Sequence, residues 1–172
     1  MGGVIVANFT DRHPERVAKL GFVDPAGFAL NFPLALRMVL LPGIGEVLFS
    51  LVGNGTLLKG MASDFYSPEL VAEFLERYKP QMEYKGFKRA ILSTIRHMVE
   101  LDALAEYEQL GESGMPVLLL WGREDQTVSA ADIETLQQAI PGAEFYPVER
   151  AGHLPHYEQP EVVNPLLIDF LR

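Results

Sequence analysis

The sequence predicts an α/β fold in which a parallel sheet is interrupted by a helical insertion. Short apolar segments typical of buried strands alternate with helical segments over residues 1–27 and 105–172. Between them, residues 28–104 place Leu, Met and Phe at helical spacings. Since parallel strands are joined by helical crossovers, the alternation favours strands that run side by side in one direction.

The N-terminal segment predicts one helix and one strand. Residues 1–11 begin with two glycines, continue with apolar residues and end in a turn-like segment, which indicates a buried helix. Residues 17–23 are mostly apolar and are stopped by Asp24 and Pro25, which indicates a buried strand that enters a loop.

The inserted segment is expected to form several short helices, because Pro and Gly interrupt its apolar pattern. The interruptions fall at residues 42–43, 53–55, 67–68, 79–80 and 86. Ser67 and Pro68 are the residue types of a helix start, and the apolar residues that follow predict an amphipathic helix of about three turns.

The C-terminal segment predicts two strands and two helices. Residues 116–122 form a continuous apolar run, typical of a strand buried on both faces of a parallel sheet. Residues 132–140 predict a short helix that a Pro-Gly pair ends, and residues 143–148 predict another strand. Residues 161–171 close the chain as an amphipathic helix.

Composition excludes several classes of function. A chain of 172 residues fits one compact domain, and 23 acidic against 14 basic residues give a net charge of −9. Nucleic acid and anionic membranes are poor partners for such a surface. The chain has no cysteine, which excludes disulfides, thiolate catalysis and cysteine-based metal sites and favours a cytoplasmic location.

Neither a membrane span nor a metal or cofactor site is predicted. The most apolar stretch, residues 28–58, is broken by Pro, Gly and charged residues before it reaches the length of a span. The N-terminus has no signal-peptide pattern. The four histidines follow no metal-binding spacing.

Two titratable residues follow consecutive predicted strands. Asp125 comes just after the strand at residues 116–122, and His153 comes 28 residues later, after the strand at 143–148. Sites in open α/β sheets are built at this edge. A carboxylate placed against an imidazole there can orient the ring and stabilise its protonated form. Asp125 as a loop-capping residue and His153 as a structural histidine are the plainer alternatives.

The sequence around both residues resembles the α/β-hydrolase family. Residues 121–125, Trp-Gly-Arg-Glu-Asp, resemble its acid-bearing loop, and Gly152-His153 with residues 158–161 resembles its histidine loop. The resemblance implies a partial α/β-hydrolase fold, made of the last strands and helices of the parallel sheet, with an inserted helical cap at residues 28–104. It implies Asp125 as the triad acid and His153 as the general base. Some relatives carry the acid at the position of Asp24, for which a turn-forming role is simpler.

The nucleophile motif of this family is missing. In chain order the nucleophile of G-x-S-x-G precedes the acid and the histidine, and no G-x-S-x-G occurs here. The nearest approach, around Ser113, lacks the final Gly and is interpreted as a surface turn. Met1-Gly2-Gly3 resembles the end of the G-H-S-M-G-G elbow of many relatives. We therefore expect the chain to start just after the nucleophile, with the Met1 backbone N–H at an oxyanion-hole position, and to be inactive by itself.

The resemblance implies a serine-type hydrolase of carboxylic ester or similar acyl substrates in the intact form. A C–C bond hydrolase of the ring-cleavage type and a non-catalytic fragment are the alternatives. The substrate is expected to be a small molecule with an apolar part, held by side chains of the cap. The candidates are Phe32, Leu36, Met38, Leu40, Phe49, Met61 and Phe65. A first strand without an inner neighbour also predicts self-association through an exposed sheet edge.

Overall fold

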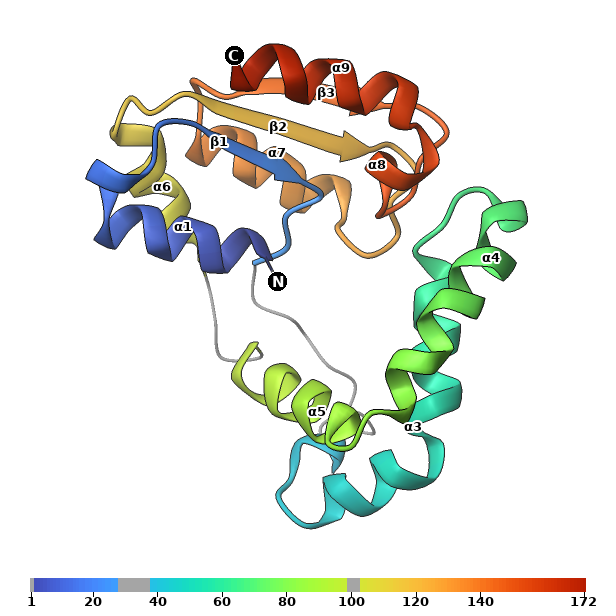
Figure 1. The fold of residues 1–172 in the computed structure, drawn as a ribbon. Helices are drawn as coiled ribbons and strands as arrows, with labels where there is room; N and C mark the ends of the chain where they lie inside the picture. Colours follow the sequence, from blue (N-terminus) through green and yellow to red (C-terminus); the bar gives the residue numbers. More distant parts are fainter. Residues whose placement is uncertain (1, 28–37, 99–102) are drawn as a thin grey trace. The chain divides into compact units, whose positions relative to one another are not determined.

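The computed structural model describes residues 2–27, 38–98 and 103–172 (Figure 1). Their contacts define two compact units. We call the first the sheet unit; it holds the described residues of 1–28, 64–67 and 102–172. The second, the helical unit, holds those of 29–63 and 68–101.

A parallel sheet of three strands forms the centre of the sheet unit, which confirms the predicted α/β class. The strands β1 (Leu20–Val23), β2 (Val117–Gly122) and β3 (Glu144–Val148) lie in the order β1-β2-β3. Phe22 pairs with Leu119, which pairs in turn with Phe145. β2 is buried on both faces because helices pack on both, as its continuous apolar run predicts.

Helices cover both faces of this sheet (Figure 1). They are α1 (Gly2–Arg12), α6 (Leu104–Glu112), α7 (Ala130–Ala139), α8 (Pro155–Glu158) and α9 (Pro160–Leu171), with a short 3-10 helix η1 (Pro14–Arg16). One core cluster joins α1, α6 and α7 to the sheet around Tyr107 and Leu119. The other joins α9 to the opposite face around Leu120 and Val163. The fold is therefore a three-layer α/β arrangement.

Some boundaries in the sheet unit differ from the prediction for local reasons. α1 buries only one face, because Val4 and Ala7 are buried whereas Ile5 is 61% exposed. The predicted strand at 17–23 begins only at Leu20, because η1 precedes it. α7 begins two residues before the predicted start at residue 132. Its first turn is capped, because the Ser129 hydroxyl accepts the Asp132 N–H while the Asp132 carboxylate accepts the Ser129 N–H. α8 was not predicted.

The helical unit contains α3 (Ile44–Ser63), α4 (Pro68–Tyr78), a 3-10 helix η2 (Lys79–Glu83) and α5 (Phe87–Met98). The start of α4 at Pro68 and its length agree with the prediction. The expected break at residues 53–55 is wrong, because α3 runs straight through it. Gly53 packs on the Phe49 ring, and glycine lowers helix propensity without removing a backbone donor as proline does.

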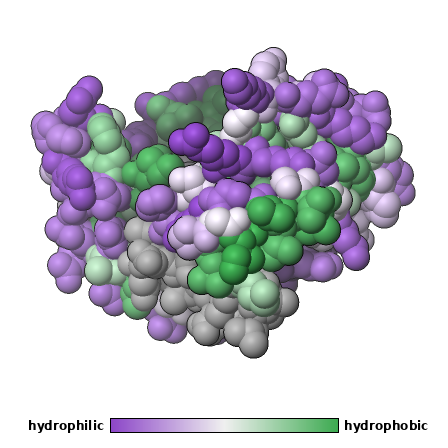
Figure 2. All heavy atoms as spheres, turned by 90° about the horizontal axis from the view of Figure 1, so that it is seen from below, coloured by the Kyte–Doolittle hydropathy of each residue, from purple (hydrophilic) through white to green (hydrophobic). Residues whose placement is uncertain are grey.

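Apolar side chains gather on one face of the molecule in Figure 2. The exposed apolar side chains of α3 are Ile44, Val47, Leu51 and Val52. Within residues 2–27, 38–98 and 103–172 there is no helix with the length and hydropathy of a membrane span.

Candidate active site

Asp125 and His153 meet at the C-terminal edge of the sheet, as their positions after β2 and β3 predict. His153 Nδ1 lies 2.8 Å from Asp125 Oδ2, within hydrogen-bond distance. The Asp125 side chain is fully buried, whereas that of His153 is 22% exposed. One ring nitrogen is therefore held by the carboxylate while the ring stays open to solvent.

The backbone of its own turn holds the second oxygen of Asp125. Oδ1 accepts the N–H of Thr127 at 2.7 Å and of Val128 at 3.1 Å. The Asp125 N–H donates to the Gly122 carbonyl at 3.0 Å. Asp125 thus caps its loop with one oxygen and binds the imidazole with the other. The loop-capping role and the role of a triad acid are therefore compatible.

Two residues without an expected role fix the histidine loop. The Glu158 carboxylate, 8% exposed, accepts the Gly152 N–H at 2.6 Å and the Ser67 N–H at 2.7 Å. The His153 N–H donates to the Asp64 carbonyl at 2.7 Å. The motif at residues 158–161 drew attention to Glu158 without assigning it a contact. No sequence signal indicated Asp64, because it lies 89 residues before His153 in the chain.

The acid and histidine loops approach each other through glycine backbone. A Cβ at Gly122 would collide with the Gly152 carbonyl and would lie 2.6 Å from that of Ala151. Glu124 is not the residue bonded to His153, since its carboxylate accepts the Ala151 N–H at 3.0 Å. Because the two loops touch there, position 122 has no room for a side chain, and the Glu124 side chain is held by its hydrogen bond to the histidine loop.

Electrostatics favour an ionised acid and a basic imidazole. Burial alone would raise the pKa of Asp125, but the hydrogen bond and charge of His153, with the backbone N–H groups, lower it below the usual value. Burial would lower the pKa of His153, but the Asp125 hydrogen bond and charge raise it, together with the charges of Asp24 and Asp64. Burial and the His153 charge lower the pKa of His156.

The other candidate acid, Asp24, lies buried nearby but is not the partner of the imidazole. It is 3% exposed, and its Oδ1 accepts the Gly122 N–H at 2.9 Å. Burial raises its pKa to about 8. Of the two carboxyl groups, Asp125 is the one bonded to His153 Nδ1.

The remaining predicted site residues are Met1 and the candidates in the cap. Met1, Phe32 and Leu36 fall outside the described residues. Phe65 belongs to the sheet unit, where its ring packs edge-on against Tyr157 at 5.7 Å.

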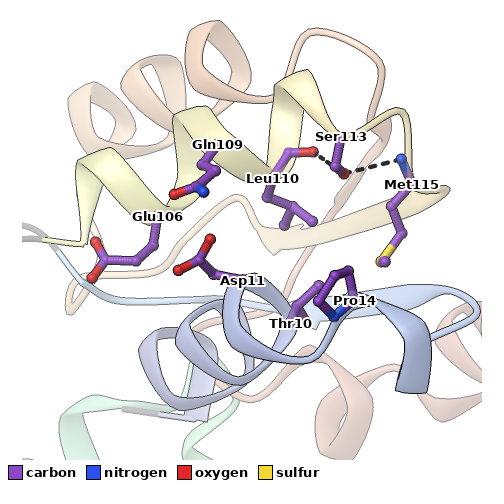
Figure 3. A pocket seen from close by; sticks show the side chains of 8 residues that line it. All are labelled: Thr10, Asp11, Pro14, Glu106, Gln109, Leu110, Ser113 and Met115. Atoms are coloured by element: carbon purple, nitrogen blue, oxygen red, sulfur yellow. Dashed lines mark hydrogen bonds between the residues drawn. The ribbon is translucent and has the colours of Figure 1, made fainter.

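Ser113 lies in a turn after α6, as its interpretation as a turn residue predicts. Its hydroxyl donates to the Leu110 carbonyl and accepts the Met115 N–H. The residue lines a surface hollow of about 130 Å³ between α1 and α6 (Figure 3), which includes neither Asp125 nor His153. In the described part of the chain, no three His, Asp or Glu residues are arranged to hold a metal ion.

A comparison with protein families shows to which family the chain belongs. The family model described as alpha/beta hydrolase fold matches residues 1–160, which include every element of the sheet and the Asp125–His153 pair. The chain belongs to the α/β-hydrolase fold family.

Individual relatives of this α/β-hydrolase include two kinds of enzyme. A 2-hydroxy-6-oxo-6-phenylhexa-2,4-dienoate hydrolase of Burkholderia cepacia is 30% identical over 177 residues, which are 99% of this chain and 60% of that protein. Lipase 3 of Moraxella sp. (strain TA144) is 26% identical over 170 residues, 92% of this chain and 49% of that protein. The chain thus spans about 60% or less of the length of these relatives.

Solved structures show the same fold. The 2-hydroxy-6-oxo-6-phenylhexa-2,4-dienoate hydrolase from Rhodococcus sp. strain RHA1 aligns with a TM-score of 0.75 and 22% identity, over all of this chain and 61% of that one. The three strands correspond to part of a larger α/β-hydrolase sheet, as a partial fold predicts.

Proposed function

We propose that these residues supply the acid–base pair of a serine-type hydrolase that acts on carboxylic ester or similar acyl substrates. The observation that carries the proposal is the 2.8 Å contact between Asp125 Oδ2 and a partly exposed His153 ring. A carboxylate on Nδ1 sets the tautomer in which Nε2 is free to take a proton. The raised pKa of His153 strengthens it as a base.

In the proposed mechanism a serine on a nucleophile elbow attacks the ester carbonyl while His153 Nε2 takes its proton. Asp125 stabilises the imidazolium, which then gives the proton to the leaving alcohol. Water repeats the attack on the acyl-enzyme with the same base. The 172 residues contain no G-x-S-x-G, so in this proposal the serine lies before Met1 and the Met1 N–H contributes to the oxyanion hole.

A C–C bond hydrolase is the second candidate. The relative from Burkholderia cepacia, 30% identical, is named for hydrolysis of a 2-hydroxy-6-oxo-dienoate. That chemistry would use the same acid–base pair. Lipase 3 of Moraxella, matched over 92% of this chain, supports the ester proposal instead.

Activity assays distinguish the two candidates. We expect the chain, joined to an N-terminal segment that supplies the G-x-S elbow, to hydrolyse p-nitrophenyl esters, and we expect His153→Gln to abolish this activity. His97→Gln is the control, because His97 is exposed and its ring contacts the Ser93 carbonyl of its own helix, away from Asp125 and His153 in the chain. Activity on a vinylogous diketone alone would replace the ester proposal with C–C bond hydrolysis.

The 172-residue chain provides a separate test of the missing nucleophile. We expect a serine-directed fluorophosphonate probe to leave it unlabelled. Labelling that disappears in His153→Gln would contradict this, because it would place an activated serine within these residues.

Three further properties belong to the same proposal. The substrate is a small molecule with an apolar part, which suits the apolar composition of residues 28–104. The absence of cysteine supports a cytoplasmic location. Self-association through the sheet edge at β1 is proposed because, among the described strands, β1 pairs only with β2.

A further inference from the structure

Asp24 is a buried acid for which the proposed mechanism has no use. It follows the last residue of β1 and is 3% exposed. Its N–H donates to the Leu120 carbonyl at 3.0 Å. Its φ of 43° is in the left-handed region, which costs a non-glycine residue free energy. A strained, buried carboxyl group at the edge that carries the site calls for an explanation.

The first oxygen of Asp24 fixes the junction between the acid and histidine loops. Oδ1 accepts the Gly122 N–H at 2.9 Å within the buried interior. The carbonyl of Gly122 accepts the Asp125 N–H, and its Cα faces the Gly152 backbone. Asp24 thus holds the residue through which the turn of Asp125 contacts the loop of His153.

The second oxygen has a different environment. Oδ2 is buried and accepts no N–H or O–H group of the described residues. An ionised carboxylate left in that state is costly. Burial is the largest cause that raises the pKa of Asp24 to about 8, opposed by the Gly122 N–H and the charge of His153. The Asp125 carboxylate raises it further, through its charge and as a side-chain hydrogen-bond partner.

We propose that Asp24 is a positioning residue of the Asp125–His153 pair, a neutral carboxylic acid that accepts from Gly122 through Oδ1 and donates its proton through Oδ2 to the Asp125 carboxylate. The inference rests on the proposed function for the role of the pair. The groups that act on Asp24 are Asp125 and His153, and Asp64 acts on His153 as well. At neutral pH a protonated Asp24 therefore adds no negative charge near the imidazole.

The first test is the titration of Asp24 itself in the 172-residue chain. Carboxyl ¹³C NMR, with Asp24→Asn to assign the signal, should give a midpoint near the value of about 8. A midpoint near the ordinary 3.8 of aspartate would overturn the proposal. This measurement needs no substrate and no stable alanine variant.

The second test follows the imidazole by ¹⁵N NMR. Asparagine reproduces the neutral acid, so Asp24→Asn should move the His153 pKa by less than about 0.3 units. A fall of more than about half a unit would show that Asp24 is a second anion. Asp11→Asn, on the exposed end of α1, controls for the loss of one surface charge.

The third test asks whether Asp24 positions the pair. Asp24→Ala removes both contacts and should speed solvent exchange of the His153 Nδ1–H at least about tenfold, with Asp24→Asn restoring slow exchange. Equal exchange in wild type and Asp24→Ala would overturn the positioning role. If Asp24→Ala does not fold, the two titrations decide. Failure of ester hydrolysis would refute the proposed function and leave these measurements unaffected.

Discussion

At the scale of single residues, three buried acids near His153 differ because their partners differ. Asp125 has its Oδ1 on backbone N–H groups and its Oδ2 on the imidazole, so its pKa is lowered. Asp24 is buried, with one such donor on Oδ1 and none among the described residues on Oδ2, so its pKa is raised. Glu158 binds the N–H groups of Gly152 and Ser67. Local environment, and not residue type, therefore shifts the pKa values of Asp24 and Asp125 in opposite directions.

Replacement of Asp125 tests the acid–base pair. If the proposed hydrolase function holds, Asp125→Asn in the active protein should lower kcat about a thousandfold or more, because the ring loses its tautomer control. The pH–rate profile of the wild type should rise through a midpoint above 6.5, since the His153 pKa is raised and the base must be neutral. Asp125→Asn should move that midpoint down. An unchanged midpoint in initial-rate assays would contradict the role of the Asp125 charge.

Replacement of Asp24 also affects stability, in a pH-dependent way. The folded pKa of about 8 exceeds the ordinary 3.8, so the unfolded chain loses this proton first as pH rises. Asp24 therefore opposes folding increasingly from about pH 4 to pH 8. Asp24→Asn should raise the free energy of unfolding at pH 8 by more than about 1 kcal/mol. Urea unfolding at pH 4 and pH 8 measures this, and an equal effect at both values would contradict it.

At the scale of elements, turn geometry decides how the site is assembled. The sequence predicted the three strands and located Asp125 and His153 after two of them. It did not predict α8, or the contact of Asp64 with the histidine loop. Both depend on chain segments meeting from a distance, and periodicity along the sequence contains no such information.

The close approach at Gly122 gives an element-scale prediction. Gly122→Ala places a Cβ against the Gly152 carbonyl, where only backbone could move. We expect a loss of about 3 kcal/mol in the free energy of unfolding, with separation of Asp125 from His153. Gly142→Ala is the matched control in the same unit, because a Cβ there meets nothing within 4 Å. Similar urea midpoints for the two variants would contradict the close contact.

The uninterrupted helix α3 gives a second prediction at the scale of elements. Gly60 lies exposed within it, and an added Cβ meets nothing within 4 Å. Gly60→Ala should raise the free energy of unfolding by about 0.5–1 kcal/mol, because alanine loses less backbone entropy in a helix. Gly86→Ala should instead destabilise, since Gly86 has a φ of 91°. Thermal unfolding monitored by circular dichroism measures both variants. If the helix were broken at residues 53–55, Gly60→Ala would stabilise the protein by a smaller amount.

At the scale of the whole molecule, the side of the sheet unit formed by α1 and the outer edge of β1 is open among its described residues. Ile5 on α1 is 61% exposed and Phe9 is 42% exposed. The strand β1 is paired on one edge only. An unpaired edge beside apolar side chains favours association with another chain.

This open side predicts concentration-dependent self-association of the 172-residue chain. Ile5→Lys should weaken it at least about tenfold, because a charge would have to be buried at the contact. Val162→Lys on α9, 45% exposed, is the matched control and should leave it unchanged. Sedimentation velocity over a range of concentrations measures both. Equal weakening by the two variants would place the contact elsewhere.

The sequence by itself determined the α/β class, the presence of three strands and the positions of Asp125 and His153 along the chain, because alternating apolar segments and turn residues are local signals. Only the tertiary structure decided which acid bonds the imidazole, since Asp24 and Asp125 both follow strands of one sheet edge. It also decided that Asp24 is buried with one oxygen that no N–H or O–H of the described residues reaches. Burial and partner contacts arise when distant segments pack, and these set the charge of each group.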